Sequence, residues 1–143
     1  MKRPHPHSKL LCRFGLWVVG AFIVSGCGSD KPDTIPVTGE VLYNSQPVEG
    51  ASVVFVSEGP PATGTTDAQG KFTLRTFTDD DGAIAGAHRV TITKNVSEPS
   101  TPENPYPVSK NMLPAKYARP ESSQLTAEVG KGNENMFQFQ LSD

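Results

Sequence analysis

The sequence predicts an all-β fold, an antiparallel β-sandwich of about seven short strands. Thirteen glycines and thirteen prolines make the 143-residue chain rich in turns, and threonine and valine, which favour strands, are plentiful. Segments in which apolar and polar residues alternate are separated by turn residues, several of them at spacings of ~8–12 residues. Short strands at such spacing are typical of an antiparallel sandwich or barrel, and the length suits one domain.

The first 26 residues have the features of a secretory signal. Residues 1–13 are basic, and residues 14–24, FGLWVVGAFIV, form an apolar run. This run is too short to span a ~30 Å hydrocarbon core comfortably. The small residues Ser25 and Gly26 follow it and permit cleavage. We therefore expect residues 1–26 to be a signal peptide, residues 27–35 a polar tether and residues 36–143 the folded domain.

The sequence VSGC, Val24 to Cys27, resembles the lipobox of bacterial lipoproteins. In these proteins the cysteine thiol takes a diacylglycerol, and cleavage leaves the acylated cysteine as the first residue. The resemblance implies lipidation of Cys27, which we favour over ordinary cleavage near Gly26 with a free thiol. Several acyl chains on one residue anchor a chain firmly in a membrane. Gly28 rather than aspartate follows the cysteine, which in this resemblance favours the outer membrane.

The charges are distributed unevenly along the chain. Four basic residues precede residue 14, and no acidic residue precedes Asp30. The chain after residue 13 therefore has nine basic and fifteen acidic residues. A part this acidic offers no broad positive surface, so we expect no binding of nucleic acid.

Alternation assigns the strands and their faces from residue 36 onward. Residues 51–57, ASVVFVS, are apolar on both faces, as a central strand would be, and residues 58–64, EGPPATG, are expected to form a loop. Residues 95–114 carry five prolines and no alternation, which predicts a long surface connection. The apolar residues expected to share a face, strand by strand, are Val37, Val41 and Tyr43; Phe72 and Leu74; Val90 and Ile92; Leu125, Ala127 and Val129; and Phe137, Phe139 and Leu141.

Residues 64–76, GTTDAQGKFTLRT, are the clearest hairpin. Asp67 to Gly70 form its turn, because aspartate accepts backbone N–H bonds and glycine takes positive φ. This structural role explains Asp67 and Gly70 better than a ligand would. Residues 78–86, TDDDGAIAG, form a second, acidic loop.

The span Val37 to Lys94 resembles a carboxypeptidase-regulatory-like domain of the transthyretin-like, or prealbumin-like, sandwich group. The matching pieces are VTGEVLYNSQPVEGASVVFV, GTTDAQGKFTLRT and GAHRVTITK, in the order that the family has them. The tail LPAKYARPESSQLTAEVGKGNENMFQFQL resembles the ending of small bacterial lipoproteins that carry this domain. The resemblance implies the sandwich fold but no catalytic function. His88 departs from it, because the family commonly has tyrosine or another strand residue there.

His88 is the only histidine after the signal segment. A Ser-His-Asp triad would need it, but the chain has neither a G-x-S-x-G nor an H-E-x-x-H motif. One histidine and one acylated cysteine also match zinc poorly. Hydroxyisourate hydrolases resemble this fold, but they end in Y-R-G-S where this chain ends in QLSD. We therefore interpret His88 as an ordinary strand residue and expect no catalytic residue, no metal and no cofactor.

Two further groups of residues are weak candidates for binding. Asp79, Asp80 and Asp81 invite a calcium hypothesis, because calcium takes six to eight oxygen ligands. Adjacent aspartates point in different directions, however, and we favour a solvated acidic turn. Tyr106 and Tyr117 lie near prolines and could stack on sugar rings. For Tyr117 we favour packing over the edge of the core.

The sequence thus favours a lipid-anchored β-sandwich of the cell envelope with a non-catalytic binding or structural role. Its expected partners are the membrane, through the N-terminal lipid, and an unknown envelope protein or polysaccharide. A carbohydrate-binding module is the alternative, and a transthyretin-like hydrolase is the third hypothesis.

Overall fold

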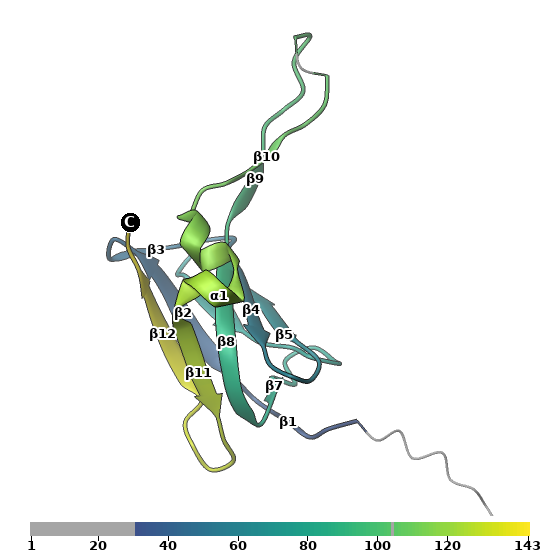
Figure 1. Ribbon diagram of the computed structural model, residues 1–143, viewed down its shortest axis with the longest axis vertical. Coiled ribbons are helices and arrows are strands. Elements are labelled where there is room, and N and C mark those ends of the chain that lie inside the picture. Colours follow the sequence, from purple (N-terminus) through teal and green to yellow (C-terminus); the bar gives the residue numbers. More distant parts are fainter. Residues whose placement is uncertain (1–30, 104) are drawn as a thin grey trace, which may run out of the picture. The chain divides into compact units, whose positions relative to one another are not determined.

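The computed structural model describes residues 31–103 and 105–143 and consists mainly of strands (Figure 1). The strands are β1 (Thr34–Ile35), β2 (Thr38–Tyr43), β3 (Gln46–Pro47), β4 (Ser52–Val56), β5 (Ala62–Thr65), β6 (Lys71–Thr73), β7 (Ala83–Ile84), β8 (Gly86–Thr93), β9 (Asn95–Ser97), β10 (Ser109–Asn111), β11 (Leu125–Val129) and β12 (Met136–Leu141). Two short helical turns, η1 (Ala115–Ala118) and α1 (Pro120–Ser123), join β10 to β11. Within the described residues, no helix is long and apolar enough to cross a membrane.

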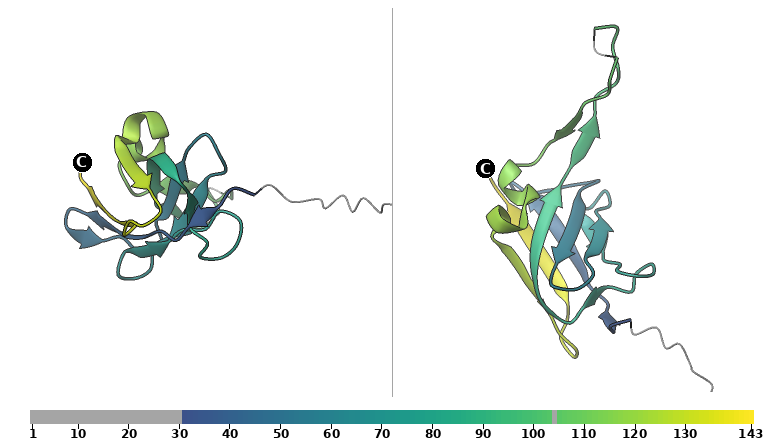
Figure 2. Two further views of the ribbon diagram at one scale, coloured as in Figure 1. Left: turned by 90° about the horizontal axis from the view of Figure 1, so that it is seen from below. Right: turned by 45° about the vertical axis from the view of Figure 1, so that its right-hand side comes forward.

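Two main sheets face each other across the core (Figures 1 and 2). One has the strand order β11–β8–β4–β5, and the other joins β12, β2 and β3, with β6 also paired to β2. The seven strands expected from alternation correspond to β2, β4, β5, β6, β8, β11 and β12. The all-β sandwich is therefore confirmed, and β4 is a central strand as predicted. The remaining strands are only two or three residues long.

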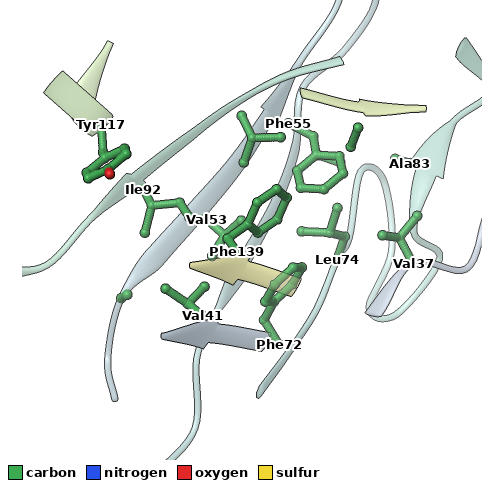
Figure 3. Packing of buried hydrophobic residues seen from close by; sticks show 14 of the residues in the cluster. Val37, Val41, Val53, Phe55, Phe72, Leu74, Ala83, Ile92, Tyr117 and Phe139 are labelled. Atoms are coloured by element: carbon green, nitrogen blue, oxygen red, sulfur yellow. The ribbon is translucent and has the colours of Figure 1, made fainter. Parts of the chain in front are cut away.

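Period-two alternation places the apolar side chains between the two sheets. Phe55 of β4 is fully buried and contacts three rings of the opposite sheet, Phe72, Phe137 and Phe139, with ring centroids 6.4, 5.7 and 6.0 Å away. Figure 3 shows this packing, in which Phe55, Phe72 and Phe139 converge from different strands. Such tilted and edge-on aromatic contacts add to the free energy that burial of the rings supplies. The inward faces predicted for β2, β6, β8, β11 and β12 are confirmed.

The direction of one strand pair differs from a purely antiparallel arrangement. β12 pairs with β2 in parallel, with Phe139 opposite Val41 and Leu141 opposite Tyr43. The two strands come from opposite ends of the domain, so no tight turn imposes an antiparallel direction on them. Gly39 allows the close approach, because a Cβ there would lie 2.4 Å from both the Phe137 carbonyl oxygen and the Phe72 ring.

The expected hairpin of residues 64–76 has the predicted turn but not a shared sheet. Asp67 Oδ1 accepts hydrogen bonds from the N–H groups of Gln69 and Lys71, both at 2.9 Å, and Gly70 has φ of 74°. The two sides of the hairpin pair with each other at Thr63 and Arg75, whose backbone N–H groups each donate to the other's carbonyl at 2.8 and 2.9 Å. Apart from this bridge, β5 pairs with β4, whereas β6 pairs with β2 in the other sheet. The turn therefore carries the chain from one layer of the sandwich to the other.

Three boundaries differ from expectation. The loop of residues 58–64 ends at Pro61, because Ala62 to Gly64 already pair with β4. The last two tether residues, Thr34 and Ile35, form β1 against β7 and so belong to the folded unit. The acidic loop, expected at residues 78–86, instead spans residues 76–82, because Arg75 still pairs with Thr63, Ala83 and Ile84 form β7, and Gly86 begins β8.

The turns η1 and α1 were also not predicted, since residues 115–123 show no helical repeat and Pro120 interrupts them.

Residues 94–103 and 105–112, called the arm below, continue β8 beyond the sandwich and return to η1. β9 and β10 pair in the arm with each other and with no other strand of the described chain. In Figures 1 and 2 the arm extends from one end of the sandwich, and β1 lies at the other end. The predicted surface connection of residues 95–114 thus contains a short two-stranded ribbon.

Candidate functional site

Cys27, the predicted lipidation site, lies outside the described residues. The folded unit begins at Lys31, four positions later in the sequence. The structure therefore leaves lipidation of Cys27 as a prediction.

His88 lies in β8 with its ring inside the sandwich, where it is only 2% exposed. Its Nε2 atom lies 2.9 Å from the Ile84 carbonyl oxygen, which can only accept, so Nε2 donates the hydrogen. The Phe55 ring lies against it, with centroids 5.7 Å apart. Nδ1 is the one buried side-chain N or O atom of the described residues without a hydrogen-bond partner. His88 therefore contacts neither a serine hydroxyl nor a carboxylate through its ring nitrogens, as a triad would require.

The three aspartates of the acidic loop have different environments. Asp81 accepts hydrogen bonds from the backbone N–H groups of Thr76, Phe77 and Thr78 at 2.6, 2.9 and 2.9 Å. Burial raises the pKa of Asp81, but these donors outweigh burial and hold the pKa below its usual value. Asp79 pairs with Arg75 at 3.0 Å on the surface, and Asp80 is exposed with φ of 60°.

The described residues contain no group of three or more His, Cys, Asp or Glu side chains that could hold a metal ion. The Asp81 carboxylate instead closes its own loop, and only Asp79 and Asp80 direct charge to the surface. This arrangement accounts for the loop as a folded turn.

The two tyrosines differ in exposure. Tyr117 is 6% exposed, and its hydroxyl group donates to the Ser142 carbonyl and accepts from the Ser142 N–H at 3.0 and 3.1 Å. Packing of Tyr117 over the core edge is confirmed, and its ring is not available to a sugar (Figure 3). Tyr106 is 78% exposed and lies in the arm.

A hollow of about 850 Å³ lies over the outer face of the β12–β2–β6 sheet. The register aligns Gln138, Glu40 and Lys71 in one row and Met136, Thr38 and Thr73 in the next. Gln138 Nε2 donates to Glu40 Oε2 at 3.0 Å. The hollow therefore presents amide, carboxylate, ammonium and hydroxyl groups, which could bind a ligand rich in hydroxyl groups.

The arm exposes several large apolar side chains. Val96, Val108 and Met112 are 44%, 50% and 54% exposed, and with Tyr106 they are four of the six large hydrophobic side chains exposed in the described chain. Sequence reasoning named Tyr106 but missed Val96, Val108 and Met112, because their alternation becomes visible only when β9 and β10 are paired. The signal available was a valine on each side of a proline-rich span.

Comparison of the chain with protein-family models, with curated proteins and with solved structures finds no match in any of the three.

Proposed function

We propose that this chain is a lipid-anchored protein of the cell envelope, with a non-catalytic binding or structural role carried by the arm. The lipobox-like sequence that ends at Cys27 supports the anchor. Residues 37–94 resemble carboxypeptidase-regulatory-like domains, which are attached to peptidases and are not themselves catalytic units. This resemblance supports a binding role. The observation that carries the proposal is the exposed apolar surface of the arm.

The position of the arm suits a contact made away from the membrane. Lys31 lies four positions after Cys27, so even an extended chain of ~3.6 Å per residue keeps Lys31 within ~14 Å of the lipidated residue. β1 follows Lys31, and it lies at the end of the sandwich opposite to the arm (Figures 1 and 2). An anchored domain can thus direct the arm into the space beyond the membrane surface.

Metabolic labelling with a fatty acid tests the anchor. Cys27→Ser is expected to remove the label, whereas Cys12→Ser, the matched control in the other cysteine, keeps it. Fractionation of the labelled protein then tests the outer-membrane placement. Equal labelling of Cys27→Ser would overturn the anchor.

A pull-down from envelope extract, which measures the proteins that the purified chain retains, tests the role of the arm. Replacing Val96, Val108 and Met112 together by serine is expected to abolish retention, because these residues supply the apolar contact area. The control replaces Asn95, Ser97 and Ser109 by alanine and is expected to retain the same partners. If the triple serine variant retains the same proteins as wild type, the apolar residues of the arm do not carry the binding role.

The surroundings of His88 support a non-catalytic role over the hydrolase hypothesis. Nε2 is held by the Ile84 carbonyl, and the ring packs on Phe55 inside the core. His88→Phe keeps an aromatic ring and removes the unpaired Nδ1 atom, so we expect a folded protein with its cellular phenotype intact. A hydrolytic activity that disappears in folded His88→Phe would contradict this.

A carbohydrate-binding module is a second candidate, and the hollow over β12, β2 and β6 supports it. Its row of Gln138, Glu40 and Lys71 offers both donors and acceptors to sugar hydroxyl groups. Binding to a panel of envelope polysaccharides tests it, with Lys71→Ala and Gln138→Ala expected to weaken binding and Tyr106→Ala to leave it unchanged. Loss of sugar binding with Tyr106→Ala alone would move the sugar site to the arm.

A further inference from the structure

The register of the arm gathers its apolar residues on one face. Ser97 lies opposite Ser109, Val96 opposite Lys110 and Asn95 opposite Asn111. The hydrogen bonds from Glu98 N–H to the Val108 carbonyl and from Met112 N–H to the Lys94 carbonyl, at 3.0 and 2.8 Å, extend this pairing by one step at each end. Opposite residues in an antiparallel pair share a face, and the face alternates along each strand.

The face that carries the apolar residues consists of three rows. Nearest the sandwich Lys94 lies beside Met112, then Val96 beside Lys110, and nearest the tip Glu98 beside Val108. The opposite face carries only small, uncharged polar residues, which are Asn95, Ser97, Ser109 and Asn111. The ribbon is therefore amphipathic, and Val96, Val108 and Met112 remain about half exposed on its apolar face.

The charges on this face complement those of an inverted copy of the same face. If a second ribbon lies on it with its strands reversed, about a twofold axis that crosses the middle row, Lys94 meets Glu98 of the second copy, and Met112 meets Val108. Val96 then meets Val96, and the one unfavourable contact is Lys110 with Lys110. The other face-to-face twofold arrangement, with parallel strands, places Lys94 on Met112 and Glu98 on Val108 and forms no ion pair.

We propose that the apolar face of the arm docks on the same face of a second copy of this chain, in the antiparallel orientation. A twofold contact uses the same patch on both partners, so each contact between two different residues, such as Lys94 with Glu98 or Met112 with Val108, occurs twice. Val96 lies on the symmetry axis, and the two Lys94–Glu98 pairs lie at its sides. This inference rests on the binding role proposed for the arm and names its partner.

The size of the face indicates a weak association that confinement strengthens. Two strands ~5 Å apart and five residues long, at ~3.4 Å per residue, present a face only ~10 Å by ~17 Å across. Stable protein interfaces bury ~800 Å² on each partner, which is much more than this ribbon offers. Anchors in one membrane would raise the effective concentration of the arms and so favour a contact that is weak in solution.

Cross-linking of the purified full-length chain in detergent tests the proposal. Cys12→Ser and Cys27→Ser remove the natural thiols, and Val96→Cys then places one thiol on the proposed axis. Facing ribbons lie ~10 Å apart, too far for a direct disulfide, so a short bis-maleimide is the suitable reagent. We expect a covalent dimer from Val96→Cys and at least ~5-fold less from Ser97→Cys, a control one residue along on the opposite face.

Charge changes in the Val96→Cys background test the orientation. Lys94→Glu is expected to lower the cross-linking rate about fivefold, and the double change Lys94→Glu with Glu98→Lys is expected to restore it. Lys110→Ser is expected to raise the rate, because it removes a like-charge contact. Equal cross-linking of Val96→Cys and Ser97→Cys, or no rescue by the charge swap, would overturn docking between copies.

This experiment is independent of the anchor, because the variants lack Cys27. If the dimer fails while other proteins are retained through the arm, the proposed binding role stands and the partner is a different protein. If the dimer forms in this experiment but labelling finds no lipid on wild-type Cys27, the contact between copies stands and the proposed lipid anchor is wrong.

Discussion

The acidic loop of residues 76–82 and the arm both connect strands, but they differ in what their side chains contact. A charged side chain of the loop bonds to the loop's own backbone, whereas apolar side chains of the arm remain exposed. In the loop, Asp81 turns inward on its own backbone and accepts three N–H groups. In the arm, Val96, Val108 and Met112 remain about half exposed, and no described strand beyond the arm pairs with its edges. The loop satisfies its own bonding groups, whereas the arm leaves apolar area for another molecule.

The difference shows where a binding surface should be sought in this fold. Three adjacent aspartates are a noticeable feature of the sequence, yet only Asp81 among them accepts backbone N–H groups of the loop. Single exposed hydrophobic residues are ordinary on protein surfaces, but three on one face of a free ribbon are not. We therefore expect substitutions in the sandwich core and in the acidic loop to lower the free energy of unfolding more than substitutions in the arm do.

Removal of an aromatic ring from the core should lower the free energy of unfolding more than any change in the acidic loop or the arm. Phe55→Ala is expected to lower the free energy of unfolding by about 3–5 kcal/mol, because the fully buried ring packs on Phe72, Phe137 and Phe139. Denaturant unfolding followed by circular dichroism measures this change. A loss below about 1 kcal/mol would mean that the two sheets do not share this core.

A side chain at Gly82 should break the acidic loop. Gly82 has φ of 85°, and a Cβ atom there would lie 1.8 Å from the Ile35 carbonyl oxygen. Gly82→Ala is expected to cost more than about 2 kcal/mol, because both the backbone conformation and the neighbouring chain must change. Gly132→Ala is the matched control, since it also has φ of 85° but no atom within 4 Å of the added carbon. Equal losses at both positions would show that only the φ angle matters.

Asp81→Asn, which removes the charge, should have a smaller effect. We expect it to lower the free energy of unfolding by about 1 kcal/mol, as for other side chains that cap backbone N–H groups. Asp79→Asn and Asp80→Asn are the controls and should change stability by less than about 0.5 kcal/mol, because both carboxylates are exposed. Equal losses from all three variants would contradict the special role of Asp81.

The contribution of Asp81 should also depend on pH in a definite direction. Its pKa in the folded protein lies below the usual value of ~4. The folded state therefore favours the carboxylate, and this stabilisation is present above pH ~4 and is lost as pH falls through the folded-state pKa. The stability difference between wild type and Asp81→Asn should shrink in acid, which unfolding at several pH values measures. A difference that grows on acidification would contradict the assignment.

Much of the sandwich follows from period-two alternation, because a strand with one buried face must alternate. Val37 with Val41, and Phe139 with Leu141, show it directly. The same rule places His88 inward with Val90 and Ile92, although the sequence pattern alone does not reveal its contact with Phe55. Alternation cannot give the parallel pairing of β2 with β12, because no turn connects strands so distant in the chain.

The arm shows a different limit of sequence reasoning. Its two strands are three residues each, too short for a visible pattern, and proline-rich sequence separates them. Val96 and Val108 share a face only because Ser97 pairs with Ser109, and that register is a property of the folded ribbon. The candidate surface of this protein therefore became apparent only from strand pairing.

Polar substitutions in the arm should have the smallest effect on stability. Val96→Ser and Val108→Ser are expected to change the free energy of unfolding by less than about 1 kcal/mol, because these side chains remain 44% and 50% exposed in the folded chain, whereas Phe55 is fully buried. Native-state hydrogen exchange adds an independent measurement. Amides of the arm should exchange through local opening, and those of the central strands β4 and β8 only through opening close to global unfolding. A loss above about 1 kcal/mol, or equal protection of arm and sandwich, would show that the arm packs on its own domain and would leave no free surface for a second molecule.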